Sequence, residues 1–567
     1  MLAITSACFA QGKVSLQIEW RAAHAITRSM TISPFVRAVL RIAGVQRHLS
    51  RTGRCGVLWR ASAIVLAAIG MLGPASSWAA TYYVDSVLGN DGSDGQSATA
   101  PWRSLQRIRD MPFQPGDTIL LVAGSMWREP LVITRSGRNN APIIVGVTGV
   151  GPRPRIEVGG VADYGAALFN AEFVTVRGLE VTNDAMPVRP RFGVLVSAQD
   201  SGVRRGIAVT DMYVHDVRGT NDRKDNGGIV FRALGPKLAT RFEDLKIERN
   251  IVWRVDRSGI AGISDQVTIA RWFPSGKVVI RDNLVEDVGG DGIVPRGTDG
   301  ALIEHNIVRY AGSRAPGYNA AIWQWSTDRS LIQLNEAAFT VTRYDGQGFD
   351  SDFNSRRTSF VYNYRHDNAG GFLLICSPRR NDKDNLGNYG TTARFNVSRN
   401  DAGRIFQLSG PVSDVLIKNN IVHVPMRIDA QMVIATQWDG WANDVRFVEN
   451  SFAVLGTARY GHEAGRSGPD YIIAPGFSPA ENIRFKGNAF LGRHVDPPAD
   501  EQGIFDAAYT APQPDWGVPV FNPASAEDFT TFILRHRSWM VTMLERELRA
   551  PVRPMQPSRT TFFEARR

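Results

Sequence analysis

The chain has 567 residues, with 65 Lys and Arg against 55 Asp and Glu, which gives a formal charge of +10 and a pI near 9.6. Hydrophobic residues make up 43% and charged residues 21%, which excludes wholesale disorder and a polytopic membrane protein. Three cysteines with no CxxC pair exclude a disulfide scaffold and a zinc knuckle.

Residues 1–80 form a basic leader. They contain nine Lys or Arg and one acid, so eight of the ten net charges lie there. The uncharged run Ala61–Gly73 is shorter than the about twenty residues that span a bilayer. It fits a signal-peptide core with cleavage near Ala79 and Ala80, and a membrane anchor is the alternative. Because the leader is long, translation could start at an internal methionine such as Met30. We expect a secreted or periplasmic protein.

A short phrase recurs through the body of the chain: alternating apolar and polar residues, then Asn, then more apolar positions. The repeated asparagines are Asn250, Asn283, Asn306, Asn335, Asn363, Asn396, Asn420, Asn450 and Asn488, and weaker copies place Asp211 and Gly178 there. Alternation with period two predicts strands, and the midway Asn, Asp or Gly predicts a left-handed bend. Strands at this variable spacing, without helices between them, predict solenoid coils whose asparagines stack in a ladder. A propeller, the alternative, fits this spacing poorly.

These copies, with the opening TYYVDSVLGNDGSDG and the following PGDTILL, resemble the pectate-lyase-like superfamily of secreted carbohydrate-active proteins. The resemblance covers residues 81–495. It implies an all-β fold, a right-handed parallel β-helix solenoid.

Both ends of a solenoid need covering. A short amphipathic helix near Ser104–Met111 is expected to cap the first coil. Residues 496–550 are expected to form an extension at the other end with a C-terminal amphipathic helix, begun by a capping box of Ser525 and Asp528. Its apolar stripe is Phe529, Phe532, Ile533, Trp539, Met540, Met543 and Leu544. Residues 551–567 are expected to be a loose basic tail.

Aligning the second strand of successive coils predicts two outward columns. One is Val294, Trp323, Asp350, Leu373 and Phe406, and the other is Arg296, Trp325, Asp352, Ile375 and Leu408. Asp350 and Asp352 would then lie on one face beside two tryptophans. A glycosidase needs such a pair, because one carboxyl protonates the leaving oxygen while the other activates water or attacks carbon. Trp323 and Trp325 would supply a platform for a sugar ring.

Other polar residues are expected near this pair. Asp345, Asp291 and His366 would orient or tune the catalytic acids, because like charges push one pKa upward. Arg296 and Asp367 would contact the substrate. The acids in turns also fit purely structural roles, and His366 could simply bond a carbonyl. Clustered carboxylates could instead bind Ca²⁺.

The residues favour an exported glycoside hydrolase acting on a neutral or weakly charged poly- or oligosaccharide. The alternatives are a polysaccharide lyase that uses Ca²⁺ and Arg on a uronic-acid glycan, and a non-catalytic glycan-binding β-helix. Residues 81–530 carry a net charge of −3, so the basic pI does not indicate a polyanionic partner. Long loops at 184–191, 215–226 and 377–391 are expected to form the walls of a cleft. We expect a monomer with no required cofactor, no nucleic-acid partner and, after signal cleavage, no membrane contact.

Overall fold

The computed structural model describes residues 79–549, except 343, 382, 467, 512–514 and 523–526. The signal peptide predicted within residues 1–80 and the basic tail at 551–567 therefore fall outside the described residues, apart from residues 79 and 80. The chain divides into two compact units, Met1–Ser77 and Trp78–Arg567, and only the second is described here. Among the described helices, none is both long and apolar enough to cross a membrane.

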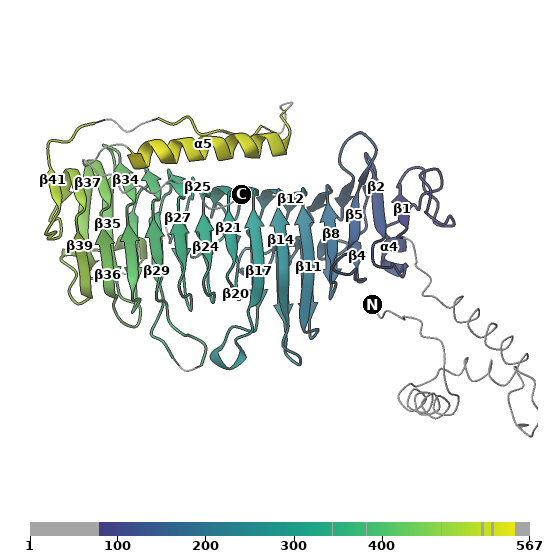
Figure 1. Ribbon diagram of the computed structural model, residues 1–567, viewed down its shortest axis with the longest axis horizontal. Helices are drawn as coiled ribbons and strands as arrows, with labels where there is room; N and C mark the ends of the chain where they lie inside the picture. Colours follow the sequence, from purple (N-terminus) through teal and green to yellow (C-terminus); the bar gives the residue numbers. More distant parts are fainter. Residues whose placement is uncertain are drawn as a thin grey trace, which may run out of the picture. The chain divides into compact units, whose positions relative to one another are not determined.

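The described chain winds into coils whose strands form three parallel stacks, running lengthwise in Figure 1, and two of these stacks belong to one continuous sheet. The first stack is β1 (Thr81–Val84), β2 (Thr118–Val122), β5 (Ile143–Thr148), β8 (Val174–Arg177), β11 (Val203–Thr210), β14 (Arg241–Glu248), β17 (Ser275–Arg281), β21 (Leu302–Glu304), β24 (Leu331–Gln333), β27 (Ser359–Val361), β30 (Thr392–Arg394), β33 (Val415–Lys418), β36 (Asn443–Val448) and β39 (Glu481–Lys486), with β20 (Thr298–Asp299) beside β17.

The second stack is β3 (Met126–Trp127), β6 (Arg155–Glu157), β9 (Glu180–Asn183), β12 (Tyr213–Val217), β15 (Ile251–Val255), β18 (Leu284–Val288), β22 (Ile307–Ala311), β25 (Glu336–Ala338), β28 (Tyr364–His366), β31 (Val397–Arg399), β34 (Ile421–Val424), the first part of β37 (Ser451–Glu463), β40 (Ala489–Val495) and β41 (Ile504–Asp506). The pairing of β41 with β40 continues the parallel sheet beyond 495, the expected end of the β-helix.

The third stack is β4 (Leu131–Ile133), β7 (Tyr164–Phe169), β10 (Phe192–Gln199), β13 (Gly227–Leu234), β16 (Ser258–Ser264), β19 (Ile293–Val294), β23 (Ile322–Gln324), β26 (Gln347–Ser351), β29 (Gly371–Cys376), β32 (Arg404–Ser409), β35 (Asp429–Thr436) and the second part of β37. A short β38 (Ile473–Pro475) pairs antiparallel with β37. The predicted all-β solenoid, a parallel β-helix, is confirmed.

The predicted asparagine ladder runs along the turn between the first and second stacks. Each Asn side chain donates to the carboxamide oxygen of the next Asn at 2.8–3.0 Å, from Asn250 to Asn488. All nine are buried. Because each amide also bonds backbone groups, as Asn250 does with the carbonyl of Val209, the ladder satisfies polar atoms that the turn buries.

Two details of that prediction are wrong. The left-handed residue is the one before each Asn, with φ of 54–60° at Arg249, Asp282, His305, Leu334, Tyr362, Phe395, Asn419 and Glu449 and 72° at Gly487. In the weaker copies the strand register puts Met212 and Leu179 at the ladder position. Asp211 and Gly178 therefore occupy the preceding left-handed position, which suits short or absent side chains.

The first coil is capped as predicted, by α4 (Gln106–Asp110). Leu105 and Ile108 are buried in the core, where Trp102 stacks on Tyr82 with ring centroids 4.9 Å apart. The helix is shorter than expected, but its apolar face closes the end of the solenoid.

The C-terminal helix α5 (Phe529–Arg549) lies along the side of the solenoid and not over its end (Figure 1). Its N-terminal half packs on Leu284 and Ile307, and its C-terminal half packs on Tyr364, Val397 and Ile421 of later coils. The predicted stripe is buried or half-buried there. Asp528 caps the helix by accepting from the Thr531 amide at 3.1 Å, whereas Ser525 lies outside the described residues.

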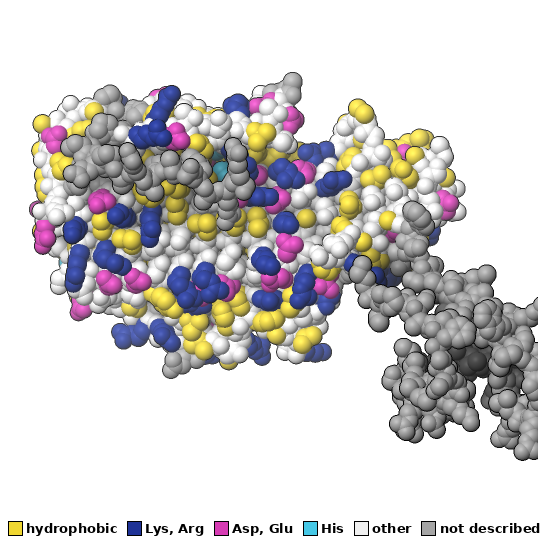
Figure 2. Space-filling model, viewed as in Figure 1, with side chains coloured by type: hydrophobic (Ala, Val, Ile, Leu, Met, Phe, Trp, Pro, Cys, Tyr) yellow, Lys and Arg dark blue, Asp and Glu magenta, His cyan; other side chains and the backbone are white. Residues whose placement is uncertain are grey.

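The outer face of the first stack is a solvated surface of mixed charge. Figure 2 shows Lys and Arg interspersed with Asp and Glu over this face. Many are paired, such as Arg281 with Glu248 at 2.9 Å and Arg446 with Asp414 at 2.7 Å.

Candidate active site

The third stack brings the predicted tryptophans and acids together. Trp323 of β23 pairs with Asp350 of β26, and Gln324 pairs with Ser351, so Trp325 is followed in the next coil by Asp352. These four side chains lie on the outward face of the stack, as the sequence predicted.

Beyond Asp350 the predicted columns are wrong by one residue. Asp350 pairs with Leu374 and not with Leu373, and Leu374 pairs with Gln407 and not with Phe406. The pairing is continuous from Gln347 with Gly371 to Ser351 with Ile375, so the expected match of Phe349 with Phe372 was one residue off. Phe372 is nevertheless buried, against Phe349 and Phe406 with ring centroids 6.3 and 5.1 Å away, so its burial misled the alignment.

The shift puts Cys376, and not Ile375, beside Asp352. The Cys376 thiol donates to Oδ1 of Asp352 at 3.0 Å and lies 3.9 Å from Oδ1 of Asp350. One ligand atom from each of the three residues lies within 4.8 Å of the other two. Asp350 is 2% exposed and Cys376 is 5% exposed, whereas Asp352 is half-buried.

Asp345 joins this cluster from the loop before β26. It takes a left-handed conformation (φ 50°), forms a parallel bridge with Asn319, and is half-buried. Its backbone carbonyl accepts from the Arg404 guanidinium at 3.3 Å. The following Gly346 donates to the Asn319 carbonyl at 2.9 Å, which fixes the direction in which the loop enters the strand.

Burial and mutual repulsion raise the pKa of all three carboxyls. Burial and the Asp352 charge raise the pKa of Asp345 to about 7. Burial, with the charges of Asp352 and Asp345, raises the pKa of Asp350 well above its usual value. Burial also raises the pKa of Asp352, but hydrogen bonds from the Cys376 thiol and the Phe353 amide oppose that rise. The hydrogen bonds thus favour the ionised form of Asp352 relative to its two neighbours.

Asp291 lies next to this cluster but is engaged in ion pairs. It is fully buried, accepts from Lys224 at 3.0 and 3.1 Å and from the Trp323 indole at 2.9 Å, and lies 3.2 Å from the Arg257 guanidinium. It therefore holds Lys224 and Trp323 in place.

A pocket of about 310 Å³ opens over the coils just before the acids. It is lined by Arg223, Lys224, Asp225, Gly262, Ile263, Val294, Arg296, Trp323 and Trp325. Arg296 and both predicted tryptophans thus meet in one cavity. A cation lies over each indole, with Lys224 Nζ 4.5 Å from the Trp323 ring centroid and the Arg296 guanidinium 4.2 Å from that of Trp325.

Two of the predicted long loops contribute to the site. The loop at 215–226 supplies Lys224. The loop at 377–391 supplies Asn388, whose buried amide donates to the carbonyls of Ser351 at 2.6 Å and Cys376 at 3.1 Å. Asn388 therefore ties the acidic strand to the next one. The loop at 184–191 folds around buried Arg191, which donates to the carbonyls of Ala185 and Pro187.

The prediction that His366 and Asp367 join the site is wrong. His366 lies in β28 of the second stack, under α5, with Asp367 at 2.7 Å and Glu336 at 3.5 Å. Asp367 is occupied by His366 and Asn400. Both residues follow the ladder turn directly, so the fold directs them to a different face from the residues of β26.

The sequence interpretation missed Lys224 as a site residue and gave no role to Cys376. Lys224 reaches the acids from a loop two coils away, a contact that strand periodicity does not encode. A signal for Cys376 did exist, because it is the second residue after Leu374 in the strand that follows the acids. The mistaken alignment of Phe349 with Phe372 concealed it.

The donor set does not suit Ca²⁺, which takes six to eight oxygen ligands. Here one of three clustered donors is a thiol, and burial with the nearby acids raises the pKa of Cys376 well above its usual value. The thiol keeps its proton and gives it to a hydrogen bond with Asp352.

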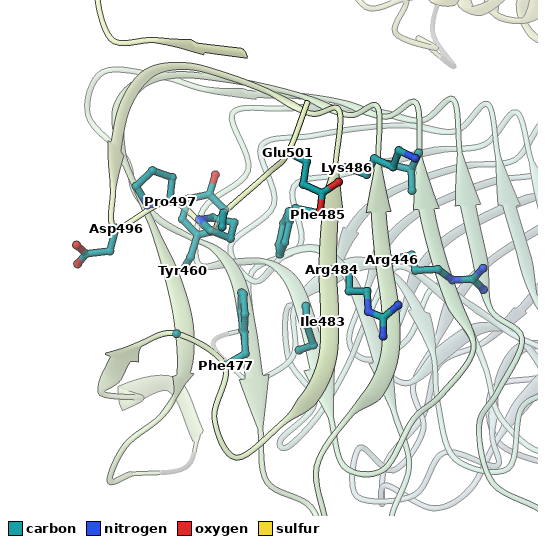
Figure 3. Close-up of a pocket in the computed structure, with 14 residues that line it drawn as sticks. Arg446, Tyr460, Phe477, Ile483, Arg484, Phe485, Lys486, Asp496, Pro497 and Glu501 are labelled. Carbon is teal, nitrogen blue, oxygen red and sulfur yellow. The ribbon is translucent and has the colours of Figure 1, made fainter. Parts of the chain in front are cut away.

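A larger cavity of about 670 Å³ lies at the C-terminal end of the solenoid, beside β36 and β39 (Figure 3). Tyr460, Phe477 and Phe485 line its inner wall, and Arg484 lies on its rim. The acids that line it, Asp496 and Glu501, are exposed. It therefore lacks the crowded carboxyls of the third stack.

No protein-family model matches the chain. The chain is similar to a protein of Bifidobacterium longum subsp. longum named lacto-N-biosidase, with 28% identity over 477 residues. The similarity covers 66% of this chain and 29% of the relative, so the chain spans less than a third of that protein's length.

Among solved structures, the GH136 lacto-N-biosidase from Eubacterium ramulus matches with a TM-score of 0.55 and 22% identity, over 79% of this chain and 70% of that one. Its selenomethionine derivative matches with a TM-score of 0.55 and 23% identity, over 75% and 68%. The chain shares their fold. The predicted resemblance to secreted β-helix proteins is confirmed at that level.

Proposed function

We propose that this chain is an exported glycoside hydrolase that acts on an oligosaccharide. The observation that carries the proposal is the acidic cluster of Asp345, Asp350 and Asp352, in which one carboxyl has a pKa near neutrality beside a carboxylate that receives hydrogen bonds. Glycoside hydrolysis needs this combination of one protonated and one ionised carboxyl. The 28% identity to a protein named lacto-N-biosidase supports the same reaction class.

Exposure assigns the roles within the cluster. Asp345 and Asp352 are half-buried and can reach a substrate, whereas Asp350 is 2% exposed. Asp345, with its pKa of about 7, is the general acid that protonates the leaving oxygen. Asp352 is the ionised partner that stabilises the oxocarbenium-like transition state and attacks carbon or activates water. Asp350, whose pKa is raised well above its usual value by burial and by the charges of Asp352 and Asp345, is only 2% exposed and contributes to the low-dielectric surroundings.

Export is part of the proposal and rests on the leader. Its uncharged core and basic flank are features of a signal peptide. N-terminal sequencing of the protein recovered outside the cytoplasm should find a start near Thr81. A start within the first sixty residues would contradict export by cleavage.

The reaction is tested by incubating the protein with oligosaccharides that end in lacto-N-biose and with a panel of neutral and uronic-acid glycans. New reducing ends without ultraviolet-absorbing unsaturated product are expected. An unsaturated product would instead show a lyase, and glycan binding without turnover would show a binding protein.

The roles are tested with Asp345→Asn and Asp352→Asn, which should each lower kcat/KM by about 10²–10⁴-fold. On an aryl glycoside, whose leaving group needs no proton, Asp345→Asn should recover most of its activity and Asp352→Asn should not. Asp414→Asn, on the exposed first stack, is the matched control. Equal recovery by both variants would contradict the assignment.

A further inference from the structure

The pocket over Trp323 and Trp325 contains two cations in different electrostatic situations. Lys224 is matched, because its ammonium bonds the buried carboxylate of Asp291 at 3.0 Å. Arg296 has no ion pair or hydrogen bond among the described residues, and its buried Nε lacks a partner there. A half-buried guanidinium without partners is stabilised when a ligand supplies hydrogen-bond acceptors.

The acid whose charge acts on Arg296 does not form an ion pair with it. Asp265 is the one carboxylate whose charge acts on it. That side chain already accepts from the Gly235 amide at 2.9 Å and the Gln266 amide at 2.7 Å, and it forms no ion pair with Arg296 within 4.0 Å. The Arg296 guanidinium lies 4.2 Å from the Trp325 ring centroid, and Arg296 lines the pocket.

We propose that this pocket binds a sugar unit carrying one anionic group, a carboxylate or a sulfate ester, and that Arg296 is its counter-ion. The inference rests on the proposed function and deepens it, because it selects a weakly charged oligosaccharide over a neutral one. A planar guanidinium matches the two oxygens of such a group with two parallel hydrogen bonds.

The distance to the acids fits this role. Arg296 bridges Trp325 in the next coil, and Trp325 is followed by Asp352 one coil later. Two steps of parallel strands place Arg296 about 10 Å from Asp352 along the solenoid. One sugar unit fits between them, so the anionic group belongs to the sugar at or next to the cleaved bond. The cavity of about 310 Å³ is large enough for that unit.

A neutral sugar would serve this pocket less well. Of its lining residues, Arg223, Lys224 and Arg296 are cationic and Asp225 is the single acid. Asp225 pairs with Arg223 at 2.7 Å. Lys224 shares the Asp291 carboxylate with Arg257, whereas Arg296 has no acid at ion-pair distance among the described residues. Hydroxyl groups would leave the charge of Arg296 uncompensated.

The test measures quenching of tryptophan fluorescence by methyl glucuronide, glucose 6-sulfate and methyl glucoside at constant ionic strength. It needs no turnover, so its outcome is separate from that of the hydrolase assay. The intact protein is expected to bind at least one anionic sugar about tenfold or more tightly than the glucoside. Tighter binding of methyl glucuronide would indicate a carboxylate ligand, and tighter binding of glucose 6-sulfate would indicate a sulfate ester.

Arg296→Gln should abolish that preference, and Arg296→Lys, which keeps the charge without the fork, should keep part of it. Arg484→Gln, in the larger C-terminal cavity, is the matched control and should leave the preference unchanged. Circular dichroism verifies that each variant is folded. Equal binding of all three sugars to the intact protein would overturn the proposal, as would a preference that survives in Arg296→Gln or is lost in Arg484→Gln.

Discussion

Two buried polar clusters lie on neighbouring stacks of the same coils. In one cluster the buried acid is paired with cationic side chains, and in the other the acids lie close to one another. Under α5, Glu336 is fully buried but is met by Arg309 and His536 at 2.6 Å and by His366 at 3.5 Å. In the third stack, Asp345, Asp350 and Asp352 face one another.

The pKa directions follow from these partners. Burial alone would raise the pKa of Glu336, but Arg309, His366 and His536 hold it well below its usual value. Burial would lower the pKa of His366, yet Asp367 and Glu336 raise it to about 9. The α5 cluster is therefore a set of matched charges that fastens the helix. The acidic cluster is mismatched, and a fold tolerates such a cost where it has a use.

The largest expected effect comes from breaking the matched cluster. Glu336→Gln leaves the Arg309 guanidinium buried without its counter-charge and removes the acceptor of His536. The free energy of unfolding should fall by about 3–5 kcal/mol, measured by urea denaturation. Glu449→Gln, an exposed acid at a ladder turn, is the control and should change it by less than about 0.5 kcal/mol. An unchanged stability in Glu336→Gln would mean that the cluster does not fasten α5.

Replacing an acid of the mismatched cluster should have the opposite sign. Asp350→Asn removes a carboxyl whose ionisation is opposed by burial and by the charges of Asp352 and Asp345, so it should raise the free energy of unfolding at neutral pH by on the order of 1–3 kcal/mol. Because the pKa of Asp350 is higher in the folded than in the unfolded protein, its stabilising contribution is present at low pH and is lost as pH rises.

The gain from Asp350→Asn should therefore be small near pH 4 and grow toward pH 8. Thermal unfolding of both proteins across that range measures it. A gap that stays constant with pH would show that Asp350 is not a repelled, protonated acid. A loss of stability at every pH would show that it is matched after all.

The two clusters also show how far sequence reasoning reached. The ladder, the coils and the position of Asp350 and Asp352 beside two tryptophans followed from local alternation and a repeated Asn. The register beyond Asp350 did not, because Phe372 and Leu373 are both buried and alternation alone does not tell which of them pairs with Phe349. His366 was misplaced since a turn of one residue decides which stack a side chain belongs to.

Contacts made by loops and by α5 were beyond prediction for the same physical reason. Lys224 reaches Asp291 across 67 positions of sequence, and His536 reaches Glu336 across 200. Periodicity encodes which face of a strand is buried, but not which distant segment lies over that face. The sequence therefore contained no sign that Lys224, from the loop at 215–226, lies close to the acids of the third stack.

The smallest expected effect concerns Cys376, a neutral side-chain donor to the mismatched cluster. Cys376→Ala removes the thiol hydrogen bond to Asp352, so the pKa of Asp352 should rise further and the acidic limb of the kcat/KM profile should move to higher pH. Activity at the optimum should fall by less than about tenfold, the range of one hydrogen bond. Cys376→Ser keeps a donor and should keep most of the original profile. A uniform loss at every pH, with Ser no better than Ala, would instead make Cys376 a packing residue and leave Asp352 to be held by the Phe353 amide alone.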